Sequence, residues 1–359
     1  MRKLIIILIV GAFASTAKAQ TGILVSSDNS QAKAFNKSDS AEYYLQKGLA
    51  EKAKGRLMVA YKYFDTAYSF DKTDKRIVGE LAKSLFDLRR YAQSRQKYME
   101  LEKLGDTSKD TYNQLMNISF NLRQFDDATK YALLLKKVDT SVKVYYYIAK
   151  SNYEQENYGE ALKYLQLAAG EDATNAEVPY MIARSYADMN NYKMAIPFFL
   201  KALSLQPSNN RWMYETGLIY YAMNDDNNSL KYFLMAADSG YKKDNEYMEN
   251  LAIAYLNTKQ IDKGLDILET SLKRRPADVN LLNMIAEANY DAKRYDKAID
   301  YWDQILTMDK KNASALFMIG MSYQKKGEKA KGQDLCDKAI LMDPSLGKNR
   351  QKVEMPGGL

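Results

Sequence analysis

The chain has 359 residues, 46% of them hydrophobic, with a formal net charge of +7 and a mean hydropathy of −0.49. It contains no histidine and a single cysteine. These absences exclude Ser-His-Asp and Cys-His catalysis, zinc sites built on histidine, haem attachment through the usual Cys and His signature, and any intramolecular disulfide. Only six prolines and 17 glycines occur, which favours one elongated helical domain.

The first 19 residues have the three parts of a cleaved secretory signal. These parts are a basic start, MRK, a short apolar run, LIIILIVGAFA, and a small-x-small site at Ala17-Lys18-Ala19. The alternative is a membrane anchor, but the run is shorter than the roughly 20 apolar residues that span a bilayer. No cysteine lies near the site to accept a lipid. The sequence therefore predicts cleavage after Ala19 and an exported protein of the periplasm or cell envelope, with no integral membrane segment after cleavage.

Residues 20–40 are rich in Ser, Asn and Asp and lack a sustained hydrophobic period, which predicts a flexible leader. Asp39-Ser40-Ala41 resembles the three-residue O-glycosylation signal of some exported bacterial proteins. The alternative is that Asp39 or Ser40 caps the first helix. The helical part of the chain is expected to begin at residue 41.

The net charge gives little reason to expect a nucleic-acid partner. Removal of Arg2, Lys3 and Lys18 with the signal lowers the formal charge from +7 to +4. The densest basic run, Lys273-Arg274-Arg275, falls where a helix is expected to end, and the helix macrodipole favours cations there. Mild charge and export therefore both argue against binding of nucleic acid.

From residue 41 onward, small residues recur at a nearly constant interval. We call them the anchors: Ala60, Ser94, Ala128, Ala161, Ala195, Ser229, Gly264, Ala298 and Gly332. The intervals between successive anchors are 34, 34, 33, 34, 34, 35, 34 and 34 residues. A second, mostly small position lies twelve residues before each anchor: Gly48, Ala82, Met116, Ala149, Ala183, Gly217, Ala252, Ala286 and Gly320. Nine units of one repeating structure are therefore predicted.

A small residue in each of two successive helices lets their backbones approach closely, while large side chains of neighbouring units fill the space beside them. Each unit is therefore predicted to be a helical hairpin. One hairpin cannot bury its own apolar face, so consecutive hairpins are expected to stack into a solenoid. This packing would also keep residues 192–207 helical in spite of Pro197, which removes one backbone hydrogen bond.

One unit carries the marks of a known repeat, namely Ile182, Ala183, Tyr186, Ala195, Phe199, Ala202 and Pro207. These residues and the 34-residue period resemble the tetratricopeptide repeat (TPR) family. The resemblance covers residues 41–346, in units that start near residues 41, 75, 109, 142, 176, 210, 245, 279 and 313, and it leaves 347–359 as a short tail. It implies an all-α fold, a right-handed superhelical α-solenoid of about nine TPR hairpins. It also implies a non-catalytic protein-protein interaction scaffold whose concave groove binds a partner segment.

The resemblance places the groove lining on the first helix of each hairpin. The implied partner-binding residues are Asn113, Asn117, Lys143, Tyr146, Tyr147, Lys150, Tyr180, Arg184, Arg211, Tyr214, Glu246, Glu249, Asn250, Glu287, Tyr290 and Asp291. The groove is expected to be basic and aromatic in its middle and acidic toward its C-terminal part, with a protein or peptide as partner. The alternative is an ordinary solvated face.

Catalytic and cofactor chemistry have little support in the sequence. Cys336 occupies the position of Phe199 and Trp302 in other units, which predicts a buried core thiol. Glycine-rich phosphate loops are missing, and neither a cofactor nor a metal is expected. A pair of carboxylates can hydrolyse glycosides, but the 45 acidic residues are scattered. A carboxylate-dependent glycan hydrolase is therefore only a remote alternative to a protein that is not an enzyme.

The C-terminal end lacks a polar capping helix of ordinary length, since only SLGKNRQKVEMPGGL follows Pro344. The last hairpin is therefore expected to leave apolar residues exposed, namely Phe317, Met318, Met321, Leu335, Ile340 and Leu341. Exposed apolar patches mark association surfaces. Self-association through the C-terminal repeats is thus possible, and the alternative to a groove-binding scaffold is a structural subunit of an envelope or secretion assembly joined through its terminal repeats.

Overall fold

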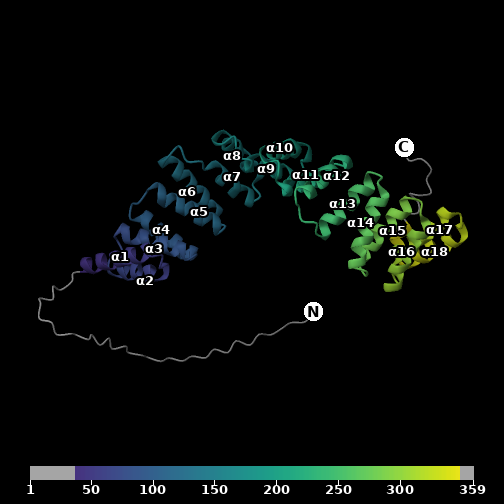
Figure 1. The fold of residues 1–359 in the computed structure, drawn as a ribbon, viewed down its shortest axis with the longest axis horizontal. Coiled ribbons are helices and arrows are strands. Elements are labelled where there is room, and N and C mark those ends of the chain that lie inside the picture. The colour runs from purple at the N-terminus through teal and green to yellow at the C-terminus, as the bar shows by residue number, and fades with distance from the viewer. Residues whose placement is uncertain (1–36, 348–359) are drawn as a thin grey trace, which may run out of the picture. The chain divides into compact units, whose positions relative to one another are not determined.

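The computed structural model describes residues 37–347, which form eighteen α-helices and one short 3-10 helix and contain no strand (Figure 1). The predicted signal peptide, most of the predicted leader and most of the predicted tail lie outside these described residues. The chain divides into two compact units. The first ends at Ile77 and the second begins at Val78, within α3. No helix of the described residues is both long and apolar enough to cross a membrane.

The helices form nine consecutive hairpins. The first helices are α1 (Lys37–Ala53), α3 (Lys75–Asp87), α5 (Lys109–Asn121), α7 (Tyr145–Glu154), α9 (Glu177–Asp188), α11 (Asn210–Ala222), α13 (Asn245–Asn257), α15 (Val279–Asp291) and α17 (Ala313–Lys326). The second helices are α2 (Leu57–Phe70), α4 (Tyr91–Lys103), α6 (Phe125–Val138), α8 (Tyr158–Glu171), α10 (Tyr192–Leu205), α12 (Asp226–Asp238), α14 (Ile261–Arg274), α16 (Tyr295–Met308) and α18 (Lys329–Met342). The 3-10 helix η1 (Pro344–Leu346) follows α18.

The predicted fold class is confirmed, because the described chain is an all-α solenoid of helical hairpins. From α4 to α18, each helix packs against the next one in sequence. Six of the first helices, α3, α5, α11, α13, α15 and α17, begin at the predicted residue. Two first helices differ clearly. Helix α1 already begins at Lys37, so Asp39 lies inside its first turn and not ahead of it, and α7 begins three residues late, at Tyr145.

The anchors lie where two helices of a hairpin cross, and all nine are buried. The hydroxyl of Ser94 donates a hydrogen bond of 2.8 Å to the carbonyl oxygen of Ala82, the earlier small residue of the same hairpin. At Gly217, an added Cβ would lie 2.6 Å from a ring carbon of Phe233, well inside van der Waals contact. The small residues therefore permit the close approach that the sequence pattern predicts.

Each hairpin turns through one residue in the left-handed backbone region, five positions before its anchor. These residues are Gly55, Arg89, Arg123, Glu156, Asn190, Asn224, Lys259, Lys293 and Gly327. The next residue then donates its N–H to a carbonyl five residues earlier, as Asn191 does to Tyr186 at 2.8 Å. This hydrogen bond is typical of a Schellman motif, which satisfies a carbonyl at the end of the first helix. The turn geometry is thus repeated although the residue type is not.

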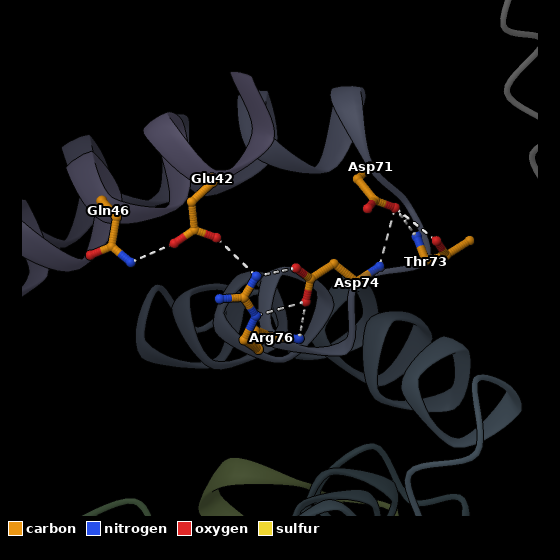
Figure 2. Close-up of polar contacts among 6 residues, drawn as sticks. All are labelled: Glu42, Gln46, Asp71, Thr73, Asp74 and Arg76. Carbon is orange, nitrogen blue, oxygen red and sulfur yellow. Dashed lines mark hydrogen bonds and ion pairs between the residues drawn. The ribbon is translucent and has the colours of Figure 1, made fainter. Parts of the chain in front are cut away.

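Aspartates close most of the turns between hairpins, and Figure 2 shows the first of these turns. Asp71 Oδ1 accepts hydrogen bonds from the backbone N and from Oγ1 of Thr73, both at 2.8 Å. Arg76 Nη2 donates to Glu42 Oε2 at 2.8 Å and to Asp74 Oδ2 at 2.6 Å, so one guanidinium ties α1 to the start of α3. An aspartate accepts from the backbone N–H two residues later in further turns as well, at Asp106, Asp139, Asp172, Asp309 and Asp343.

Two single-residue predictions have clear outcomes. Helix α10 continues through Pro197, which is exposed on its outer side, while Ala195 and Phe199 on either side are fully buried. Packing of the inner face therefore maintains the helix despite the missing hydrogen bond. The prediction of a buried thiol is confirmed, since Cys336 is completely buried.

The last hairpin keeps a smaller part of its apolar side exposed than the sequence predicts. Leu346 of η1 packs against Phe317, Met321 and Cys336, so Phe317 and Met321 are only 5% and 7% exposed. Met318, Leu335 and Ile340 are half-buried. Only Leu341 of the six named residues remains strongly exposed, at 83%. The short turn after Pro344 covers the end of the core because its single leucine folds back onto α17 and α18.

Candidate partner-binding site

A hollow of about 650 Å³ opens between α9, α10 and α11, and we call it the central pocket. Its lining consists of Arg184, Ala187, Asp188, Asn190, Tyr192, Phe199, Arg211, Tyr214, Glu215, Leu218, Ile219 and Tyr241. The pocket combines apolar side chains with two arginines and two carboxylates. That combination is typical of sites that bind a ligand by shape and by a few placed polar groups.

Glu215 organises the polar side of the central pocket. Its Oε1 accepts from Arg211 Nε at 2.9 Å, and its Oε2 accepts from Tyr180 Oη at 2.8 Å and from Arg184 Nη1 at 3.4 Å. The Glu215 side chain is only 16% exposed, whereas that of Arg211 is 68% exposed. The Glu215 carboxylate is therefore less exposed than the two arginines and fixes both guanidinium groups at the surface of the pocket.

The environment of Arg184 and Tyr180 keeps both side chains in their usual protonation states. Burial is the largest single influence on Arg184 and disfavours its charge, but Glu215, Tyr153 and Tyr180 together outweigh burial, and the net effect raises the pKa of the guanidinium. Burial, and after it the Glu215 carboxylate, raises the pKa of Tyr180 to about 12. At neutral pH Arg184 is thus a cation and Tyr180 a neutral hydrogen-bond donor.

Stacked aromatic rings support the pocket. Tyr180 stacks on Trp212 with ring centroids 4.7 Å apart, and Tyr214 stacks on Tyr241 at 4.6 Å. Asn250 Nδ2 donates to Tyr214 Oη at 2.7 Å. Burial raises the pKa of Tyr214 to about 12, so its hydroxyl stays protonated. Stacking and hydrogen bonding together fix the side chains that shape the site.

The structure brings some of the sequence-predicted residues together here. Tyr180, Arg184, Arg211 and Tyr214 converge around Glu215, and Asn250 and Glu246 join through the hydroxyl of Tyr214, Glu246 at 3.4 Å. Sequence reasoning missed Glu215 and Asp188, which formally neutralise Arg184 and Arg211. The signal for Glu215 was present, because it lies four residues after Arg211 on the same face of one helix. The middle of the groove is therefore less basic than expected.

The two predicted lysines of hairpin four, Lys143 and Lys150, contact different neighbours. Lys143 lies ahead of α7, not on it, and its ammonium group pairs with Asp172 at 2.8 Å. Lys150 instead lies over the ring of Phe120, 5.3 Å from its centroid. The remaining predicted residues there are half-buried or exposed polar and aromatic side chains, Asn113, Asn117, Tyr146 and Tyr147.

Toward the C-terminus, the predicted acidic residues divide into two groups. Glu249 is used internally, because it pairs with Arg275 at 2.6 Å. Glu287, Tyr290 and Asp291 instead line two further hollows, of about 310 and 510 Å³, on either side of α15.

The chemistry of the central pocket suits binding. Both of its carboxylates accept hydrogen bonds from neighbouring side chains, Glu215 from Tyr180 and Asp188 from Tyr153. Within residues 37–347, no group of three or more His, Cys, Asp or Glu side chains could hold a metal ion.

Comparison with known proteins gives matches in family and fold. A family model described as tetratricopeptide repeat matches residues 176–209 and 313–346, and a second model of the same description matches residues 249–315. No curated protein matches the chain. Among solved structures, the C-terminal part of a TPR repeat-containing protein from Cytophaga hutchinsonii is 19% identical, with a TM-score of 0.54 over 66% of this chain and 98% of that one.

Two further solved structures overlap a shorter part of the chain. YrrB, described as a TPR protein with an unusual peptide-binding site, is 16% identical, with a TM-score of 0.44 over 49% of this chain and 91% of that one. A MamA structure is 18% identical, with a TM-score of 0.42 over 46% and 97%. The repeat-model matches identify residues 176–209 and 249–346 of this chain as tetratricopeptide repeats, and the Cytophaga hutchinsonii protein shares its fold.

Proposed function

We propose that this protein is a non-catalytic protein-protein interaction scaffold that binds an extended segment of its partner in the central pocket. The observation that carries the proposal is the arrangement of Arg211. Its Nε is held by Glu215 at 2.9 Å while its side chain remains 68% exposed. Within residues 37–347, its two terminal amino groups have no hydrogen-bond partner, so they can pair with a carboxylate or carbonyl oxygen of a ligand.

The apolar part of the pocket complements this polar contact. Phe199, Leu218 and Ile219 line the same hollow as Arg211. An extended segment could therefore place one apolar side chain in the hollow and one acidic side chain or carbonyl against the guanidinium. Because aromatic stacking already fixes the neighbouring rings, the side chains of the pocket lose little conformational entropy when such a segment binds.

A location in the bacterial cell envelope belongs to this proposal and rests on the sequence of residues 1–19, which lie outside the described residues. The alternative role, a structural subunit joined through its terminal repeats, rests on Leu341 and Met342, which are 83% and 43% exposed. Burial of Phe317 and Met321 leaves this alternative a much smaller apolar surface than the sequence suggests.

Site-specific cross-linking tests the central pocket. Benzoylphenylalanine is introduced at Tyr192, which lines the pocket, and as a matched control at Tyr221, which is 41% exposed outside it. After irradiation in cells, affinity capture and mass spectrometry identify the adducts. We expect a discrete adduct from position 192 that position 221 does not give.

Charge reversal then connects that adduct to the pocket. Arg211→Glu should reduce the adduct at least about tenfold, since it places a carboxylate beside Glu215 and repels the ligand's acceptor. Lys231→Glu, on the exposed side of α12, is the control and should leave it unchanged. Identical adducts from both cross-linking positions, or an adduct that survives Arg211→Glu, would contradict the proposal.

A further inference from the structure

Two apolar hollows flank one exposed carboxylate in the C-terminal hairpins. The first, of about 310 Å³, lies between α13 and α15 and is lined by Leu256, Ile261 and Met284. The second, of about 510 Å³, lies between α15 and α17 and is lined by Phe317, Met318, Met321 and Leu346. Glu287 lines both hollows. We propose that they form a second binding site, for a partner segment that carries a basic residue between two apolar residues.

A relay of hydrogen bonds holds Glu287 in place. The indole Nε1 of the fully buried Trp302 donates to Asn283 Oδ1 at 3.0 Å, and Asn283 Nδ2 donates to Glu287 Oε1 at 2.8 Å. An indole N–H can only donate, so it requires the oxygen of the Asn283 amide on its side. The amide nitrogen must then face Glu287. The core thereby orients a carboxylate that lies on the surface.

The charge of Glu287 is available to a ligand. Among residues 37–347, its Oε2 accepts no hydrogen bond, and the side chain is exposed. Asp291 and Lys259 also line the first hollow, and their formal charges cancel. Of the described residues, no other charged one lines the second hollow. Glu287 is therefore the uncompensated charge between the two hollows, and a lysine or arginine complements it.

The hollows themselves suit apolar side chains. Their volumes of about 310 and 510 Å³ exceed that of a single leucine or phenylalanine side chain. Methionines line both of them, and the flexible thioether chain adapts to side chains of different shape. The spacing of the hollows on either side of one helix explains why the ligand needs an apolar residue on each side of its basic residue.

This site extends the proposed scaffold role. It shares no lining residue with the central pocket, so an experiment can refute either site without refuting the other. The probes are dye-labelled, amidated peptides with a lysine between two leucines, joined by spacers of one, two or three serines. Fluorescence anisotropy measures their dissociation constants with the full chain. Control peptides replace the lysine by glutamate, or both leucines by serine.

We expect at least one spacer length to bind the wild-type chain and both control peptides to lose binding. Glu287→Gln should weaken binding at least about tenfold while keeping the bond from Asn283. Asp300→Asn, which removes one exposed carboxylate from the neighbouring α16, should change binding less than about twofold. Trp302→Phe should weaken binding to an intermediate degree, because Phe64, Phe199 and Phe233 fill the same position in other hairpins but cannot orient an amide.

Three results would overturn the proposal. The first is no binding by any spacer length, and the second is equal binding by the wild type and Glu287→Gln at unchanged helicity. The third concerns other occupants: if peptides bind only to a chain ending at Gly347, or if Glu287→Gln dissociates a dimer in light scattering, the site holds the chain's own residues 348–359 or a second copy. Failure of Arg211→Glu to reduce the cross-link at Tyr192 would refute only the central pocket.

Discussion

At Gly217 the distance to a neighbouring ring decides which residue the position accepts. A Cβ there would lie 2.6 Å from Phe233 and 3.3 Å from the carbonyl oxygen of Ser229, which is itself an anchor. At Gly79, in the middle of α3, the nearest atom would be Leu101 Cδ2 at an ordinary 3.7 Å. The same change from glycine to alanine therefore has opposite consequences at the two sites.

We predict that Gly217→Ala destabilises the protein by about 1–3 kcal/mol, because the methyl group must displace Phe233 from a close-packed crossing. Gly79→Ala is the control and should stabilise by about 0.5–1 kcal/mol, since alanine loses less backbone entropy in a helix. Chemical denaturation followed by circular dichroism measures both. Equal changes of the same sign would show that the crossing at Gly217 can relax.

At the scale of the helical hairpin, the repeated element is a backbone conformation. Lys293 and Arg123 adopt φ of 63° and 57° at the position that Gly55 and Gly327 fill in the first and last hairpins. A side chain with a Cβ is strained in this region, so the fold imposes the conformation against local preference. The hydrogen bond that closes the turn is made regardless of the residue.

Glycine should therefore stabilise the turn and destabilise the helix next to it. We predict that Lys293→Gly raises the free energy of unfolding by about 0.5–1 kcal/mol, the relief of left-handed strain less the added entropy of the unfolded chain. Lys297→Gly, four residues later inside α16, should lower it by about 1 kcal/mol. A loss of stability in Lys293→Gly would mean that the lysine side chain makes a favourable contact that outweighs the strain.

The turn after α8 is expected to depend on pH. Hydrogen bonds from Lys143 and Thr174 lower the pKa of Asp172 from 3.8 to about 2. Because the folded-state pKa is depressed, the stabilisation is fully present above about pH 4 and is lost as the pH falls toward 2. Amide exchange of residues 172–177 should therefore accelerate across this window. Asp172→Asn should abolish that pH dependence, and an unchanged profile in this variant would contradict the assignment.

Residue spacing was sufficient to predict the hairpins but not the details of their turns or of the site. The anchors are small because two backbones cross there, and that steric requirement is visible in any one sequence. Arg89 and Glu156 have no intrinsic preference for the left-handed region, so the residue type at this position does not predict the turn. The repeat register predicts Lys143 on a helix. The unit that contains Ala161, whose anchor follows the previous one after 33 residues, begins its first helix later, at Tyr145. The partner-binding residues remain predictions.

At the scale of the whole molecule, the exposed apolar surface of the last hairpin bears on self-association. Leu346 closes the core of the last hairpin, and Leu341 projects from α18 with 83% of its surface exposed. We predict that any self-association of the protein depends on this leucine, since the other five residues of the predicted patch are buried or half-buried. Light scattering of the wild type and Leu341→Glu measures the change. Oligomers that persist in the variant would place the contact elsewhere.

The two tryptophans of the chain lie at the two proposed sites, and this gives each site its own optical signal. Trp212 stacks on Tyr180 next to the central pocket, and Trp302 donates to the asparagine that holds Glu287. In a Trp212→Phe chain the emission comes from Trp302 alone, and in a Trp302→Phe chain from Trp212 alone. Titration of either chain with a candidate partner would thus tell at which end of the α9–α17 region the partner is bound, with no added dye.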